Sequence, residues 1–256
     1  MSQFKEEIKK SYAKAINQRL QIQLNEQSSC CSPSSTSIES KESVQADCCP
    51  PTVVETKNEP TIPSFGCVIN LAQKANIQQG DIVVDLGSGA GHDLFQAADL
   101  VGPDGRAIGI DFTPDMIVAG MRTAMQNGYT NVDFRLSDIE NINILPDNFA
   151  DVIISNCVIN LTMDKGAVFK EAFRILKPGG RLVDADIIAA NQLPSEITQD
   201  PEAWCSCLGG ALTEEGYGEK IKEAGFKEIK VTIFSDFKYL NNQFQNGIIE
   251  AQKPVN

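Results

Sequence analysis

The sequence predicts an α/β protein with a doubly wound, mostly parallel sheet of seven strands. Short apolar segments typical of buried strands alternate five times with helical segments between residues 82 and 187. A glycine-rich turn follows the first of these strands, and another helix and two further strands come after residue 212. Parallel strands need a crossover between them, and helices that supply it cover both faces of the sheet. The chain of 256 residues is long enough for one such domain and an extension.

The elements of this domain follow one another in a regular order. A proline in the first turn marks the start of the second helix, and the run Lys177-Pro-Gly-Gly180 is expected to end the third. Apolar periodicity predicts strands at 82–85, 107–111, 131–136, 151–155, 181–187, 227–234 and 248–253, with helices at 92–100, 114–127, 165–176 and 214–224.

Composition divides the chain into three parts. Residues 1–27 carry apolar side chains at helical spacing between charges, which predicts an amphipathic helix over about 4–25. Residues 28–62 are rich in serine and contain the pairs Cys30-Cys31 and Cys48-Cys49, a composition typical of a flexible linker. The domain itself is predicted over 63–256, and its long connection 188–212 is expected to act as a substrate lid.

The charge of the chain excludes several classes of partner. A net charge of −12 argues against nucleic acids and anionic membranes, which require basic patches. The charged N-terminus does not resemble a signal peptide, and no apolar run is long enough to span a membrane, so a cytoplasmic location is expected. Eight cysteines in such a reducing compartment indicate metal or metalloid binding or redox catalysis rather than structural disulfides.

The turn after the first strand predicts a nucleoside cofactor. Its glycines are Gly87, Gly89 and Gly91, preceded by Asp85, whereas a dinucleotide fingerprint would place its third glycine where His92 stands. This spacing favours S-adenosylmethionine over NAD. Glycines allow the backbone to turn tightly and to approach the cofactor closely.

Polar residues at the ends of the next strands complete the predicted cofactor site. Asp111 ends the second strand, where its carboxylate can accept hydrogen bonds from both ribose hydroxyls. Asp138 and Ile139 follow the third strand and are expected beside the adenine. Met116 and Asn156 are the remaining predicted cofactor residues. His92, the only histidine, is expected to lie beside the cofactor at a helix start and not to act as a general base.

Four segments together make the chain resemble the arsenite methyltransferases, a family of Rossmann-like class I methyltransferases. The resemblance extends from about residue 63 to the C-terminus, and its most specific part is Asn-Cys-Val-Ile-Asn-Leu around Cys157. The four segments are Asp85-Leu-Gly-Ser-Gly-Ala-Gly91, Val152-Ile-Ile-Ser-Asn-Cys-Val-Ile-Asn-Leu161, Phe173-Arg-Ile-Leu-Lys-Pro-Gly-Gly-Arg181 and Cys207-Leu-Gly-Gly-Ala211.

The resemblance implies a role for each of several cysteines. Trivalent arsenic, supplied as arsenite or methylarsenite, would be held by the thiolates of Cys67, Cys157 and Cys207. Cys30 or Cys31 would take part in disulfide exchange, with thioredoxin or glutathione as the reductant. Cys205 is additional to the family pattern, so Cys207 is selected by its Leu-Gly-Gly-Ala context. The chemistry agrees, because soft thiolates select trivalent arsenic over hard ions.

Two other readings of the sequence stay open. The chain could methylate a different small acceptor, such as a quinone precursor or another metalloid. It could instead be a thiol-based metal-binding or sensor protein with a vestigial cofactor site, although the intact Asp111 and Asp138 argue against this. The four linker cysteines lack the Cys-x2-Cys spacing of zinc sites.

Overall fold

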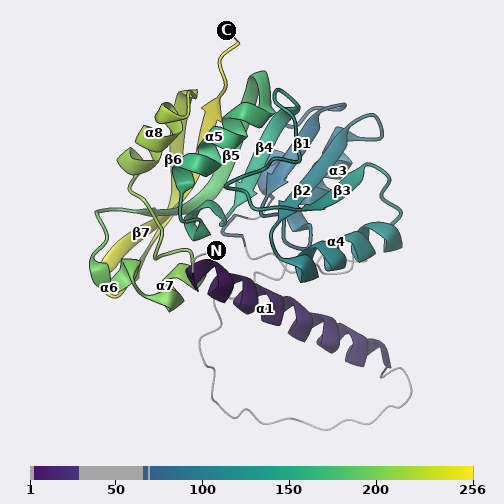
Figure 1. Cartoon of the computed structure of the whole chain (residues 1–256), viewed down its shortest axis with the longest axis horizontal. Helices are drawn as coiled ribbons and strands as arrows, with labels where there is room; N and C mark the ends of the chain where they lie inside the picture. The colour runs from purple at the N-terminus through teal and green to yellow at the C-terminus, as the bar shows by residue number, and fades with distance from the viewer. Residues whose placement is uncertain (1–2, 29–65, 69, 256) are drawn as a thin grey trace.

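The computed structural model describes residues 3–28, 66–68 and 70–255, so the linker predicted over 28–62 lies almost wholly outside the described residues (Figure 1). Seven strands form one sheet in the order β3-β2-β1-β4-β5-β7-β6. Strands β1 to β5 are parallel, and β7 is antiparallel to both of its neighbours, which confirms the predicted fold class. The strands are β1 (Ile82–Leu86), β2 (Arg106–Asp111), β3 (Val132–Leu136), β4 (Ala150–Asn156), β5 (Leu176–Ala189), β6 (Lys227–Tyr239) and β7 (Asn242–Gln252).

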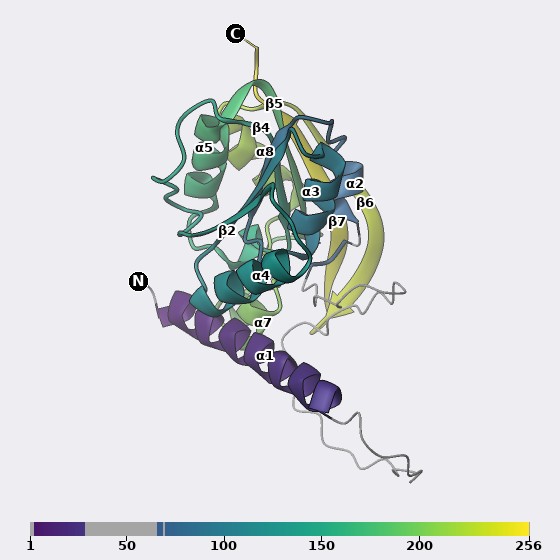
Figure 2. The same ribbon diagram turned by 90° about the vertical axis from the view of Figure 1, so that its right-hand side faces the viewer.

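Helices cover both faces of this sheet. The first face carries α2, α3 and α4, and the second carries α5 and α8, as the two views show (Figures 1 and 2). The helices are α1 (Gln3–Ser28), α2 (Leu71–Lys74), α3 (His92–Val101), α4 (Pro114–Gln126), the 3-10 turn η1 (Ile159–Leu161), α5 (Lys165–Ile175), α6 (Ser195–Thr198), α7 (Pro201–Cys205) and α8 (Glu214–Glu223).

Alternate residues of the central strands build a core on each side of the sheet. Val84 and Leu86 of β1 are fully buried against the α5 and α8 side, whereas Val83 is fully buried against α2 and α3. Successive side chains of a strand point to opposite faces, so a strand buried on both faces is a nearly continuous apolar run. Each large side chain buried in this way contributes roughly 1.5–3 kcal/mol. This packing fixes the strand ends where polar residues gather.

The N-terminal helix lies across one end of the sheet. Figure 1 shows α1 passing beneath α4 and α7, and both of these helices contact it. Ile8 and Ile16 are 1% and 2% exposed, because the apolar stripe predicted from the sequence faces the domain. Their spacing of eight residues returns the chain to one face of the helix. The helix is therefore confirmed, and it continues to Ser28, beyond its predicted end.

The structure corrects several predicted boundaries. Lys177-Pro-Gly-Gly180 ends the preceding helix as expected but belongs to β5, which begins at Leu176. Strands β6 and β7 form a longer hairpin than predicted, because the pairing continues through Tyr239 and Asn242. The connection 188–212 contains the end of β5 and the short helices α6 and α7. Its action as a lid stays a prediction.

Among the residues that the structure describes, no helix combines the length and the apolar character that crossing a membrane requires.

Candidate active site

The glycine turn after β1 is a tightly packed loop. Gly87 has a φ of 71°, in the left-handed region, and a Cβ at this position would collide with the side chain of Val158. The backbone N–H groups of Gly87 and Ser88 both donate to the carbonyl of Ile110, at 2.7 and 3.0 Å. The N–H of Gly89 donates to Oδ2 of Asp111 at 3.0 Å. The loop therefore needs glycine both for its conformation and for its close approach to the neighbouring chain.

Replacing Gly87 by alanine should disturb this loop and weaken cofactor binding. The collision with Val158 and the positive φ together should cost about 1–3 kcal/mol of local strain, which corresponds to roughly 5- to 150-fold in affinity. Calorimetric titration with S-adenosylmethionine measures the loss. Gly218→Ala in α8 is the matched control, because its added Cβ meets no atom within 4 Å. Equal affinities of the two variants for S-adenosylmethionine would contradict the prediction that this loop binds the cofactor.

A cavity opens beside this turn. It lies at the carboxyl ends of the parallel strands, where ligands bind in sheets of this topology. All of the predicted cofactor residues except Gly91 line it, and Gly91 instead begins α3 with a φ of 101°. The predicted residues on its wall are Asp85, Gly87, Gly89, Asp111, Met116, Asp138, Ile139 and Asn156.

Three buried carboxyl groups give this cavity an acidic character. Burial raises the pKa of Asp85 well above its usual range, and the nearby Asp93 and Asp111 raise it further. Burial also raises the pKa values of Asp93 and Asp111, although hydrogen bonds oppose the effect. Oδ1 of Asp93 has no hydrogen-bond partner among the described residues. A ligand carrying positive charge would relieve the mutual repulsion of these groups.

Asp111 is held in place by the loops that it connects. Its Oδ1 accepts a hydrogen bond from the backbone N–H of Thr113 at 2.8 Å, and its Oδ2 accepts one from Gly89. Each carboxylate oxygen retains a second acceptor position. The side chain therefore orders the glycine loop and can still accept hydrogen bonds from a ligand, as predicted for ribose.

Helix α1 supplies a wall of the cavity that the sequence did not indicate. Lys5, Ile8 and Tyr12 line it opposite the strand ends. Nζ of Lys5 lies 2.8 Å from Asp138 and 2.7 Å from Glu140, so an ion pair fastens the helix to the loop after β3. Burial lowers the pKa of Lys5, but the two carboxylates outweigh this effect and raise it overall. The apolar stripe of the helix was visible in the sequence, but its docking position was not.

Removing this ion pair should make the cofactor leave faster. Lys5→Met should raise the dissociation rate of S-adenosylmethionine roughly fivefold, since a partly exposed pair contributes about 1 kcal/mol. A chase of radiolabelled cofactor measures this rate. Lys10→Met, at an exposed position of the same helix, should leave it unchanged. If both variants release the cofactor at the wild-type rate, α1 does not retain it.

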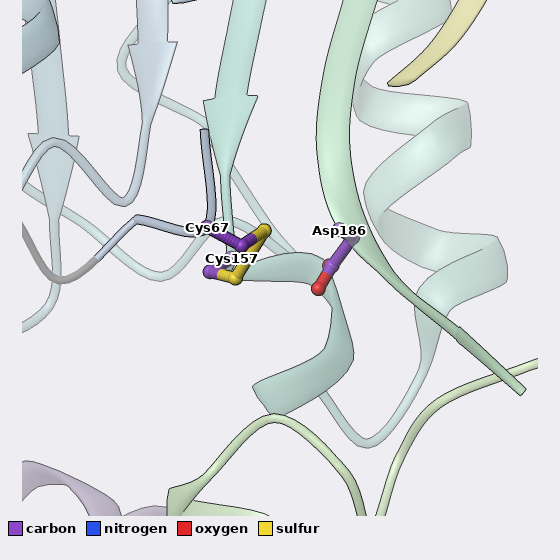
Figure 3. A group of neighbouring side chains, drawn as sticks. All are labelled: Cys67, Cys157 and Asp186. Atoms are coloured by element: carbon purple, nitrogen blue, oxygen red, sulfur yellow. A yellow bond between two sulfur atoms is a disulfide. The ribbon is translucent and has the colours of Figure 1, made fainter. Parts of the chain in front are cut away.

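The three cysteines singled out by the resemblance lie together, and Cys157 lines the cavity. Cys67 and Cys157 are paired as a disulfide, with a Cα–Cα distance of 5.8 Å (Figure 3). Sγ of Cys207 donates to the carbonyl oxygen of Cys157 at 3.0 Å. Cys157, Cys205 and Cys207 belong to one buried cluster, and Cys67 packs against it.

The expectation of reduced thiols is wrong for Cys67 and Cys157 in this structure, because the two form a disulfide and their Cα separation suits one. Cys30 and Cys31 lie outside the described residues.

Two of these cysteines have an unusual backbone conformation. Cys157 and Cys207 have φ values of 58° and 60°, in the left-handed region that residues other than glycine seldom adopt. Such conformations cost of order 1–3 kcal/mol each and concentrate at functional sites. Here the turn at Cys157 directly follows β4, so its side chain reaches the cavity wall.

Behind the disulfide lies a buried polar group that sequence reasoning missed. Asp186 of β5 is fully buried, and burial raises its pKa. Its two oxygens accept hydrogen bonds from the backbone N–H groups of Asn160 and Ile187, each at 2.9 Å. Nζ of Lys165 donates to the carbonyl of Asn160, and burial lowers the pKa of this lysine to about 8. An acid in an apolar strand was the available signal in the sequence.

A comparison with models of known protein families identifies the family of this chain. The model of a methyltransferase domain family matches residues 77–225, more than half of the chain. The chain belongs to the methyltransferase domain family. The cavity-lining residues from Asp85 to Thr162 fall inside the matched segment.

Several relatives are arsenite methyltransferases, which confirms the resemblance. The chain is 37% identical to that of Halobacterium salinarum over 191 residues, covering 71% of this chain and 49% of the relative. It is 42% identical to that of Aquipseudomonas alcaligenes over 152 residues, covering 57% and 44%. The chain thus spans about half the length of the curated relatives it matches.

Solved structures show the same fold. An arsenic(III) S-adenosylmethionine methyltransferase from Chlamydomonas reinhardtii superposes with a TM-score of 0.63 at 27% identity, covering 73% of this chain and 71% of that one. A phosphoethanolamine N-methyltransferase from Haemonchus contortus, in complex with S-adenosylmethionine, gives 0.62 at 17% identity, covering 72% and 51%. At this identity the second likeness concerns the fold alone.

Proposed function

We propose that this methyltransferase domain transfers methyl groups from S-adenosylmethionine to trivalent arsenic held by cysteine thiolates, giving methylated arsenicals. One observation carries the proposal: Cys157 lines the same cavity as the glycine turn and adjoins both Cys67 and Cys207. Thiols that bind arsenic would therefore share a cavity with the cofactor. Membership of the methyltransferase family and the similarity to arsenite methyltransferases support this proposal.

The residues around the cavity fit S-adenosylmethionine. When bound, this cofactor supplies an electrophilic methyl group on a positively charged sulfonium. Asp85, Asp93 and Asp111 favour that charge, and the last can also accept hydrogen bonds from ribose hydroxyls. The glycine loop leaves room for the cofactor, and α1 closes the opposite side with Ile8 and Tyr12. Such a closed wall excludes water from the reacting centre.

The thiols would act in their reduced form. Arsenous acid has three hydroxyl groups, and each can leave as water when a thiol gives up its proton and its sulfur binds arsenic. Cys67, Cys157 and Cys207 would displace all three and leave the lone pair of arsenic exposed. Soft sulfur ligands favour this exchange. Because the centre is fixed against the cavity wall, most of the rate acceleration would come from positioning.

Redox balance requires a reductant. Methylation raises arsenic formally from the trivalent to the pentavalent state, and two thiols that close to a disulfide return two electrons to it. The disulfide between Cys67 and Cys157 has the form that such a step would leave. Exchange with Cys30 or Cys31, and then with thioredoxin or glutathione, would restore the thiols. A cytoplasmic location would supply these reductants.

A transfer assay tests this function. The reduced full chain is incubated with methyl-labelled S-adenosylmethionine, a thiol and one acceptor at a time, and the products are separated by chromatography. We expect labelled methylarsenicals with arsenite, and no labelled product with phosphoethanolamine or a quinone precursor. Transfer to either organic acceptor, with none to arsenite, would overturn the proposal.

The two arsenic substrates should differ in their need for thiols. Methylarsenite has two exchangeable oxygens, so Cys157 and Cys207 suffice to bind it, whereas arsenite needs Cys67 as well. Cys67→Ser and a variant with both Cys30→Ser and Cys31→Ser should therefore lose activity on arsenite and retain it on methylarsenite. Product analysis with each substrate measures this difference. Equal losses on both substrates would make Cys67 an ordinary member of the site.

A further inference from the structure

Asp186 places a third ligand beside the two paired cysteines. Figure 3 shows its carboxyl group on β5 pointing toward Cys67 and Cys157. One oxygen of Asp186 and the two Sγ atoms all lie within 4.8 Å of one another. Asp186 and Cys157 are buried, and Cys67 is partly buried. Two sulfurs and one oxygen thus lie together inside the protein.

This set of donors differs from the one that trivalent arsenic prefers. Arsenic selects soft sulfur, and a carboxylate oxygen is a hard ligand. Zinc(II), a borderline ion, binds Cys and Asp together at about 2.3 Å and 2.0–2.2 Å. Donor atoms around such an ion lie about 3.5–3.8 Å apart. Once the disulfide is open, the two sulfurs would move apart to this spacing, while the carboxylate oxygen already lies within 4.8 Å of both.

The surroundings of Asp186 hold it in a ligating position. The backbone N–H groups of Asn160 and Ile187 orient its two oxygens, and the hydroxyl of Tyr217 also bonds this carboxyl group. A carboxylate has about four acceptor positions, so three hydrogen bonds leave one for an ion. Nδ2 of Asn160 donates to the carbonyl of Ile187 at 2.7 Å, which ties these two backbone segments together. Hydrogen bonds of this kind fix ligating groups in metal sites.

We propose that the reduced thiols of Cys67 and Cys157, together with Asp186, form a binding site for zinc(II) or a similar divalent ion. The ion displaces the protons of the two thiols into solvent, and a water molecule or Cys207 completes the tetrahedron. Because this site uses two of the thiols proposed to hold arsenic, the two ligands exclude each other. Metal binding itself does not depend on the proposed function; only the competition with arsenic does.

Cobalt(II) tests the site, because thiolate ligation of this ion produces a near-ultraviolet charge-transfer band and visible bands. The protein is the full chain with Cys30, Cys31, Cys48 and Cys49 changed to serine, so that the linker thiols contribute nothing. A phosphine reductant opens the disulfide by taking up the oxygen of a water molecule, which leaves two thiols. We expect the reduced protein to bind one equivalent of cobalt, which zinc displaces. The disulfide form should bind none.

Asp186→Asn should weaken cobalt binding at least about 10-fold, because loss of a ligand costs no less than loss of its supporting hydrogen bonds. Asp184→Asn is the matched control, since this equally buried aspartate lies two residues away on β5 and outside the group. Unchanged cobalt affinity in Asp186→Asn, or the absence of thiolate bands in the reduced protein, would overturn the proposal of this metal site.

A second variant at Asp186 and a competition experiment with arsenite complete the test of the metal site. Circular dichroism shows whether Asp186→Asn folds. If it does not, Asp186→Glu serves as the second variant: it keeps the carboxylate but displaces it, and should therefore shift the visible cobalt bands. Unchanged bands would contradict ligation by Asp186. Arsenite added to the cobalt-loaded protein should release the metal. Cobalt binding without this release would count against the proposed arsenic site and leave the metal site standing.

Discussion

Changing Cys157 or Cys207 to serine should abolish methylation of arsenite and leave the affinity for S-adenosylmethionine unchanged. A serine hydroxyl is a hard ligand that stays protonated at neutral pH, so it does not replace a thiolate on arsenic. We expect each variant to lose at least about 100-fold in rate, the order of loss that follows when a reacting centre is misplaced. Product analysis gives the rate, and calorimetry gives the cofactor affinity.

Cys205→Ser provides the matched control for this experiment. Cys205 lies in the same buried cluster, two residues before Cys207. Its backbone is helical, whereas Cys207 has a positive φ and reaches the carbonyl of Cys157. Cys205→Ser should therefore keep most of the activity. If it loses activity while Cys207→Ser remains active, the choice between the two cysteines is wrong.

Changing Asp111 to alanine should weaken the binding of S-adenosylmethionine about 10- to 100-fold, since each hydrogen bond to a charged group contributes about 1.5–3 kcal/mol. Part of this loss comes from the glycine loop, because the variant also removes the acceptor for the N–H of Gly89. Arsenite binding should change little. The chain's single tryptophan, Trp204, packs in the cluster with Cys157 and Cys207, so its fluorescence can report arsenite binding.

Asp111→Asn and Asp133→Ala separate the causes of that loss. Asp111→Asn keeps an oxygen that can accept from Gly89 but removes the charge, and its affinity should lie between those of the wild type and the alanine variant. Asp133 forms ion pairs with Arg106 and Arg135 away from the cavity, and its removal should not affect the cofactor. Unchanged cofactor affinity in Asp111→Ala would refute the cofactor assignment.

The sequence sufficed for the sheet and for bringing most of the predicted cofactor residues to one cavity wall, for a physical reason. Strands buried on both faces are mostly apolar, and the turn at Gly87 admits no larger residue, so both leave local signals. Asp111 and Asp138 follow strands whose ends meet at one edge, so the topology alone brings them together.

Long-range placement could not be predicted in the same way. Ile8 and Ile16 indicated a buried helix face, but nothing local specifies that this face docks on α4 and α7. Cys67 and Cys157 are 90 residues apart, and the resemblance to a family, not their spacing, placed them together. Asp186 is one of two acids in a mostly apolar strand, and only the fold brings it beside the sulfurs.

X-ray absorption at the arsenic edge tests most directly whether three thiolates of this chain hold trivalent arsenic beside the proposed cofactor cavity. The sample is the reduced full chain with one equivalent of arsenite and the linker cysteines changed to serine. We expect three sulfur neighbours and no oxygen neighbour around arsenic. Cys205→Ser should keep three sulfurs, whereas Cys207→Ser should leave two. Arsenic that keeps its oxygen ligands in the unsubstituted site, or three sulfurs that persist in Cys207→Ser, would contradict this expectation.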